Sequence, residues 1–234
     1  MTVDEVHALL ETHADPRRIA HWERRFGHTG LRSVGVGLTV LRKLAREIGR
    51  DAGLAAQLWT DGLYEARVLS LLLDDPKRIT RAQAEAQVEQ LQAGQLAHVF
   101  ASCDASLART PFVRELAEAW MASPDPMRRR CGYSLLAEIG KEKGKKAPDE
   151  GYLMRRVAQI DDARLGADPD LLLAMGYALI TIGKRSAALN RAALAVARAM
   201  GPVDWDPTGA CEPFDPVKHL DNPRLRGVLG IDAG

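Results

Sequence analysis

The sequence predicts an all-α fold in which short helices pair and the pairs stack in a row as an α-solenoid. Four observations support this prediction. Apolar residues recur at intervals of three and four along most of the chain, and residues that favour helix starts precede many of these stretches. No stretch has the alternating pattern of a strand, and no apolar block is large enough for one central helix bundle.

In the first half of the chain, helices are expected from apolar spacing and from capping residues. The N-terminus is amphipathic, and residues 38–49 and 63–74 carry apolar side chains at helical spacing. Asp51 stands before "AGLAAQLW", and Thr80 with Gln83 has the spacing of a capping box. The helices expected here span 3–14, 16–25, 38–49, 52–60, 63–74, 81–91 and 95–107.

In the second half, prolines mark several helix starts. Thr110, Asp125 and Asp168 each precede a proline, which is tolerated at the first helical position because the N–H there has no helical partner. The helices expected here span 111–121, 126–140, 149–160, 169–182 and 186–200. The last stretch, 201–234, has five prolines and no helical period, so we expect an extension that packs on the last helices.

These helices make about six pairs, and their spacing predicts the domain organisation. A period of roughly 35 to 40 residues lies in the range of HEAT-like repeats. We therefore expect a HEAT-like repeat domain over residues 1–200 and a Pro-rich C-terminal extension over residues 201–234. A solenoid with capped ends is expected to be a monomer.

The charges balance overall but are unevenly spread. The chain has 32 basic and 31 acidic residues. Residues 128–156 hold nine basic residues against four acidic ones, so a polyanionic partner would contact this stretch first.

The chain shows no sign of disulfides, metal sites or membrane segments. Its three cysteines lack paired short spacing, and its six histidines lack the spacing of metal ligands. The N-terminus lacks the basic region and apolar run of a signal peptide, and no 18-residue apolar segment occurs. We expect a cytoplasmic protein that needs no metal or organic cofactor and contacts no membrane.

Two blocks of the sequence resemble a known family. Residues 34–80, "VGVGLTVLRKLAREIGRDAGLAAQLWTDGLYEARVLSLLLDDPKRIT", resemble the DNA alkylation repair family of HEAT-like DNA glycosylases. Residues 178–206, "ALITIGKRSAALNRAALAVARAMGPVDWD", resemble the C-terminal block of one branch of that family. The resemblance implies base excision repair, in which the N-glycosidic bond of N3- or N7-alkylated purines in double-stranded DNA is hydrolysed without flipping the base. Such a protein would associate with the nucleoid when bound to DNA.

The resemblance also implies particular site residues. In "VFASCDASLARTPF", residues 99–112, the family's catalytic aspartate corresponds to Asp104, which follows the aromatic Phe100 by four residues. The family's second aromatic corresponds to Tyr177, and its DNA-contacting arginine corresponds to Arg130 in "RRRCG". We also expect the turns "KEKGKK" and "GKR" to hold phosphates. The residues expected to do so are Lys143, Lys145, Lys184 and Arg185.

Asp104 is isolated from other charges, with no basic residue within four positions. A lone carboxylate suits this reaction because an alkylated purine already carries positive charge and leaves as a neutral base, so no general acid is needed. An ionised Asp104 would stabilise the sugar cation and position water, an effect of roughly 3 to 4 kcal/mol. If residues 95–107 form one helix, Phe100 and Asp104 share a face, so that Phe100 and Tyr177 could flank the sugar.

This chain also departs from the family pattern, which keeps two other functions open. Better-known members carry tryptophan where this chain has Phe100 and Tyr177, and a basic residue where it has Ile180. One alternative is a non-catalytic HEAT-repeat protein that binds damaged, bent or branched DNA. The other is a protein-interaction scaffold, which the near-neutral net charge favours. Glu65 and Arg67 in "LYEARVLS" are expected to be structural links between repeats rather than catalytic residues.

Overall fold

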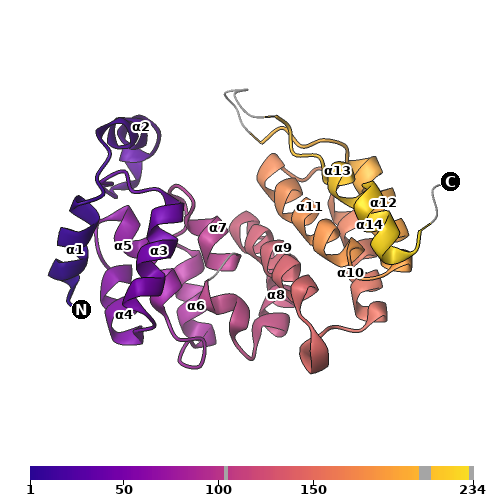
Figure 1. The fold of residues 1–234 in the computed structure, drawn as a ribbon, viewed down its shortest axis with the longest axis horizontal. Coiled ribbons are helices and arrows are strands. Elements are labelled where there is room, and N and C mark those ends of the chain that lie inside the picture. Colours follow the sequence, from indigo (N-terminus) through magenta and orange to yellow (C-terminus); the bar gives the residue numbers. More distant parts are fainter. Residues whose placement is uncertain (103–104, 206–211, 232–234) are drawn as a thin grey trace. The chain divides into compact units, whose positions relative to one another are not determined.

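The computed structural model describes residues 1–102, 105–205 and 212–231. Within these ranges it contains fourteen α-helices and three short 3-10 helices, and the only β-type pairings are two isolated bridges. The all-helical class predicted from the sequence is therefore confirmed. The chain divides into two compact units, residues 1–116 and 117–234, which are described separately below (Figure 1).

Unit 1 is organised around one buried helix, α5, whose apolar run "YEARVLSLLL" packs on nearly every side. Helices α1, α3, α4 and α7 all contact α5. Because α5 is apolar around most of its circumference, burial in the centre is the arrangement that removes most of its surface from water. The helices of unit 1 are α1 (Val3–Glu11), α2 (Pro16–Phe26), α3 (Leu38–Ile48), α4 (Ala52–Trp59), α5 (Tyr64–Leu73), α6 (Arg81–Val88) and α7 (Leu96–Ala101).

The carboxylate of Glu65 holds the loop that leads into α3. It is fully buried and accepts hydrogen bonds from Ser33 Oγ at 2.6 Å and from the backbone N–H groups of residues 34, 35 and 36 at 3.3, 2.9 and 3.1 Å. Arg67 takes a different role, since it lies over the Trp59 ring at 5.6 Å and donates to the Asp61 carbonyl. Both side chains therefore hold structure within unit 1, and they act separately rather than as a pair.

Most of the helix starts predicted from capping residues are present. The side chains of Asp51, Thr80, Asp125 and Asp168 each accept a hydrogen bond from the first turn of the helix that follows. Thr110 does not cap a helix, and this part of the prediction is wrong. Its backbone N–H donates to the Leu107 carbonyl at 3.1 Å and closes a 3-10 turn, and its hydroxyl donates to the same carbonyl at 2.9 Å. Helix α8 (Val113–Met121) begins three residues later.

The expected helix over 95–107 is also corrected by the structure. Helix α7 ends at Ala101, and the backbone of Ser102 is extended with φ −147° and ψ −170°. The chain then forms a short 3-10 helix, η2 (Ser106–Arg109), and the Ser106 hydroxyl donates to the Asp74 carbonyl at the end of α5. The sequence "SCDAS" is rich in residues that compete with helical hydrogen bonds, which explains why the helix stops early.

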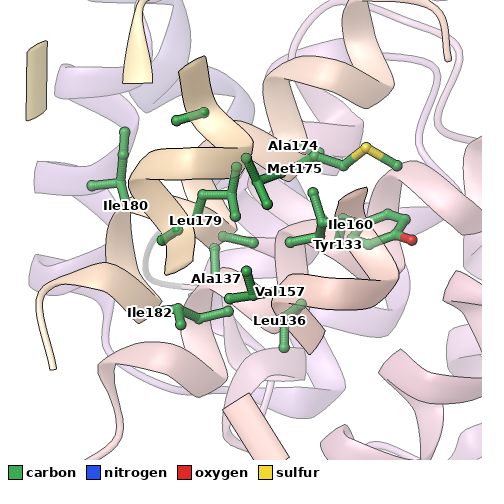
Figure 2. Close-up of a cluster of buried hydrophobic side chains, with 14 of the residues drawn as sticks. Tyr133, Leu136, Ala137, Val157, Ile160, Ala174, Met175, Leu179, Ile180 and Ile182 are labelled. Atoms are coloured by element: carbon green, nitrogen blue, oxygen red, sulfur yellow. The ribbon is translucent and has the colours of Figure 1, made fainter. Parts of the chain in front are cut away.

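Unit 2 packs α9, α10, α11 and α12 around one apolar core (Figure 2). Leu136 and Ile182 are fully buried in it, and Met175 is the flexible side chain that fills it from α11. Helix α8 crosses the boundary between the two units in the sequence. The other helices of unit 2 are α9 (Pro126–Lys141), α10 (Glu150–Ala163), α11 (Pro169–Gly183), α12 (Ala187–Met200), α13 (Pro216–Leu220) and α14 (Pro223–Leu229), with the 3-10 turn η3 (Gly144–Lys146) after α9.

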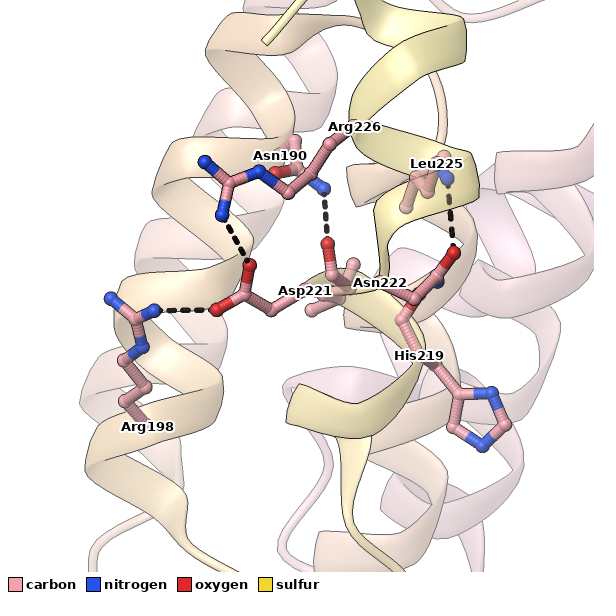
Figure 3. A network of polar contacts seen from close by, with 8 residues as sticks. Asn190, Arg198, His219, Asp221, Asn222, Leu225 and Arg226 are labelled. Atoms are coloured by element: carbon pink, nitrogen blue, oxygen red, sulfur yellow. Dashed lines mark hydrogen bonds and ion pairs between the residues drawn. The ribbon is translucent and has the colours of Figure 1, made fainter. Parts of the chain in front are cut away.

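The C-terminal segment, residues 212–231, contains two short helices that the sequence analysis did not predict, α13 and α14. Asp215 and Asn222 cap α13 and α14, each with proline as the first helical residue, which is the same signal that marks α9 and α11. The segment is tied to α12, because Asp221 pairs with Arg198 at 2.8 Å and also contacts Arg226 (Figure 3). Asn190 of α12 also donates to the Leu220 carbonyl at 3.1 Å.

Candidate functional site

Helices α9 and α11 lie against each other and run in the same direction. Arg130 near the start of α9 reaches Asp170 at the start of α11, with 2.6 Å between the guanidinium and the carboxylate. At the other end Gly140 lies so close to α11 that a Cβ there would come within 2.6 Å of the Thr181 hydroxyl. Two parallel, closely packed helices therefore bring the turns that follow them to the same end of unit 2.

The two basic turns predicted from the sequence are brought together at that end. Arg185, after α11, donates to the main-chain carbonyl of Glu142, the C-cap residue that follows α9. Lys143 and Lys145 in the first turn and Lys184 in the second are exposed, and no ion pair to any of them is found in the described residues. Arg185 thus stabilises the C-terminal end of α9, where a cation is favoured, while the three lysines present free charge to solvent.

Arg130 lies elsewhere on the same pair of helices and is already engaged. It precedes Glu142 by twelve residues along α9, a separation of about 18 Å. Its side chain is 26% exposed, and its guanidinium is paired with Asp170. A phosphate would have to replace this carboxylate, so Arg130 is a weaker candidate for DNA contact than its place in the sequence indicates.

Tyr177 is exposed, as its expected role requires. Its side chain is 46% exposed, an unusual value for a large aromatic residue on a helix whose other face is core. One side of its ring packs against Phe214 from the C-terminal segment, with 4.7 Å between ring centroids and 36° between the ring planes. The adjacent Gly176 makes room for that contact, and Ile180, which stands where a basic residue was noted in the family, is a core residue at 6% exposure.

Phe100 is not at a surface, and the expectation that its ring would flank a sugar is corrected by the structure. It lies in the core of unit 1 with 1% of its surface exposed, because α7 turns the apolar side of "LAHVFA" toward α5. The early end of α7 also removes the continuous helix on which the shared face of Phe100 and Asp104 depended. Asp104 itself lies outside the described residues.

The interior of unit 2 near α9 contains groups with shifted proton affinities. Burial raises the pKa of the Cys131 thiol to about 12, although the charge of Arg130 acts to lower it. Burial also raises the pKa of Tyr133, against the charges of Arg129 and Arg156, and its hydroxyl has no hydrogen-bond partner in the described residues. Cys131 is therefore held as a neutral thiol, and neither group is available as a nucleophile at neutral pH.

Unit 1 contains an open cavity of about 590 Å³ that the sequence analysis did not predict. Trp22 and Tyr64 form part of its wall, but they are only 6% and 9% exposed and stack on each other. Glu65 also lines it, with its carboxylate already bonded to the 33–36 loop. These side chains already pack against each other or form hydrogen bonds within unit 1, so they are poor candidates for binding a ligand in this cavity.

No group of three or more metal-binding side chains occurs in the parts of the chain that the structure describes. Among the same residues, no helix is both long enough and apolar enough to cross a membrane.

Comparisons with known proteins give one family and one related fold. A family model described as "DNA alkylation repair enzyme" matches residues 6–203. A solved structure described as "A new family of proteins related to the HEAT-like repeat DNA glycosylases with affinity for branched DNA structures" has a TM-score of 0.79 with this chain, at 19% identity. The match covers 99% of this chain and 97% of the other, so the HEAT-like repeat fold is confirmed. A search of curated proteins found no match.

Proposed function

The chain belongs to the DNA alkylation repair enzyme family, and on this premise we propose that it binds DNA through unit 2, by contacts to the phosphate backbone. The observation that supports this most directly is the exposure of Lys143, Lys145 and Lys184 at one end of α9 and α11. Lysines in turns are suited to phosphates, which they contact as point charges without reading base edges. Such a surface recognises the course of the backbone rather than a sequence.

The DNA that this surface would prefer is bent or branched. The protein of similar fold is described as having affinity for branched DNA structures, and we propose the same preference for this chain. Tyr177 supports the proposal, because an exposed aromatic ring can contact a sugar or an unstacked base, and both are more accessible at a junction than within a regular duplex.

Salt dependence of binding tests this function directly. Lys143→Gln with Lys145→Gln should reduce the slope of log K against log salt concentration by about 1.8, because each phosphate contact contributes about 0.9. The matched control is Lys43→Gln with Lys77→Gln, which removes the same charge from unit 1. Equal slopes for the two double variants would contradict the assignment to unit 2. Failure of the wild-type protein to bind duplex or junction DNA at low salt would support a protein-interaction scaffold instead.

As a second candidate we propose that the chain also excises N3- and N7-alkylated purines, with Asp104 as the catalytic carboxylate. The family to which the chain belongs favours this activity. The resemblance of "VFASCDASLARTPF" to the family's motif supports Asp104 as the counterpart of its catalytic aspartate. The proposal needs no general acid, because the alkylated base leaves as a neutral molecule. It requires neither a metal ion nor an organic cofactor.

Single-turnover release of 7-methylguanine and 3-methyladenine from methylated duplex DNA tests this activity. Asp104→Asn should slow release by roughly 100- to 1000-fold, the usual effect of losing one electrostatic stabiliser. Asp162→Asn, at an exposed carboxylate on α10, is the control and should release base at the wild-type rate. Release by the wild type that is unchanged in Asp104→Asn would rule out this role, and DNA binding without release would leave the shape-recognition function alone.

A further inference from the structure

Phe214 reaches Tyr177 from a segment that the family model does not cover. The family match ends at residue 203, and Phe214 lies eleven residues further along the chain. Its ring packs against both Tyr177 and the backbone of Gly176, so closely that a Cβ on residue 176 would lie 2.6 Å from Phe214 Cε1. Glycine at 176 is therefore what allows this aromatic contact to form.

Phe214 is itself held in place from both sides along the chain. Its backbone N–H and C=O form an antiparallel bridge with Val203, at 2.9 and 2.8 Å. The next residue, Asp215, caps α13, whose last residue Leu220 is fully buried. Asn190 of α12 donates to the carbonyls of both Gly183 and Leu220. The C-terminal segment therefore fixes the ring of Phe214 before any ligand arrives.

We infer that Phe214 is a positioning residue for Tyr177, and that the C-terminal segment is thereby part of the DNA-binding surface of unit 2. The inference rests on the proposed function. A tyrosine that is 46% exposed on a helix would otherwise sample several rotamers, and ordering it would cost free energy at binding. The ring of Phe214 covers one side of the Tyr177 ring and leaves the remainder open to solvent. The Tyr177 side chain is therefore already ordered in the free protein, and less conformational entropy is lost when DNA binds.

Affinity for a fluorescently labelled three-way junction, measured by anisotropy, tests the inference. Phe214→Ala should weaken binding by roughly 2- to 10-fold, the range expected when one side chain must be ordered on binding. Phe214→Trp should bind the junction more tightly than Phe214→Ala and nearly as tightly as the wild type, because the indole ring can pack against Tyr177 in place of the phenyl ring. The slope of affinity against salt should stay at the wild-type value, since Phe214 carries no charge.

The effect must act through Tyr177, so the decisive variant combines the two changes. Phe214→Ala should weaken binding in the wild-type background but have little effect when Tyr177 is already alanine. The matched control is Phe26→Ala in unit 1, which removes another phenylalanine stacked on a neighbouring aromatic, Trp22 at 4.9 Å. This control should leave affinity unchanged. Circular dichroism and urea unfolding of each variant identify any that fail to fold, and Phe214→Leu, which keeps apolar contact without a ring, replaces Phe214→Ala in that case.

These measurements distinguish failure of the positioning role of Phe214 from failure of DNA binding by unit 2. If the wild type binds the junction and Phe214→Ala or Phe214→Leu binds equally well, the positioning role is wrong and the proposed function stands. A similar loss with and without Tyr177 would also overturn it, since Phe214 would then act by another route. If the wild type binds no DNA, the proposed function fails and the inference fails with it.

Discussion

Replacing Gly176 with alanine should affect stability with opposite signs in two backgrounds. Gly176 lies within α11, where alanine is favoured over glycine by about 1 kcal/mol. In the native protein the added methyl would lie 2.6 Å from Phe214 Cε1, and two further ring atoms lie at 3.5 Å. A heavy-atom distance of 2.6 Å between carbons is well inside van der Waals contact, so the ring must move.

The magnitude follows from these two opposing effects. Overpacking of this kind costs about 1 to 3 kcal/mol, which exceeds or equals the gain of about 1 kcal/mol in helix propensity. Gly176→Ala should therefore lower the free energy of unfolding by about 0 to 2 kcal/mol in the wild type. In a Phe214→Ala background the clash is absent, and the same substitution should raise it by about 1 kcal/mol. The coupling energy between the two sites is then about 1 to 3 kcal/mol.

Urea unfolding of the four proteins in this cycle, followed by circular dichroism, measures the coupling. Gly227→Ala is the control, because a methyl group added to this residue of α14 would have no other atom within 4 Å, so alanine should be favourable in both backgrounds. Equal effects of Gly176→Ala in the two backgrounds would refute the reasoning that Phe214 occupies the space above Gly176. A change in the urea m-value would indicate instead that the variants no longer unfold in the same way.

Three further predictions concern buried polar groups. Burial raises the pKa of the Asp74 carboxyl above its usual value, so its contribution to stability is full below the unfolded pKa and is lost as pH rises through the folded pKa. Asp74→Asn should therefore flatten the pH dependence of urea-measured stability at pH values above the unfolded pKa of about 4. Cys131, 0% exposed with its pKa raised to about 12, should resist alkylation in the native protein and react after denaturation, as peptide mass mapping would show. Glu65→Gln should lower the free energy of unfolding in urea by about 2 to 4 kcal/mol. The amide N–H₂ would face the Val34 N–H, and the hydrogen bonds to the remaining oxygen would no longer be made to a charged group. An unchanged unfolding midpoint would contradict this.

Much of the local structure could be predicted because the signals are local. Asp51, Asp125 and Asp168 cap helices through side chains that reach only three residues along the chain, so the sequence around them contains the whole interaction. The same signals precede α13 and α14, where Asp215-Pro216 and Asn222-Pro223 could have predicted helices in the C-terminal segment. These two helices are too short to show a helical period, so the prolines around them also fit an irregular extension.

The candidate site was only partly predictable, because side-chain exposure depends on distant packing. Tyr177 and Phe100 look alike in the sequence, as aromatic residues in apolar helices, yet one is 46% exposed and the other 1%. The difference arises from which neighbouring helix covers each one. Arg130 likewise looks free in the sequence, but α11 brings Asp170 to it from forty residues away.

Periodicity, caps and motif spacing are properties of short segments, so they were sufficient to predict the helical class, most helix starts and the family. Packing between distant segments sets which charges remain available and which aromatic ring faces solvent. Parallel packing of α9 and α11 joined the two lysine turns, and a bridge between residues 203 and 214 carried Phe214 to Tyr177. Both arrangements depend on contacts between residues far apart in the chain. The burial of apolar surface determines which of these residues meet, and no short stretch of sequence contains that information.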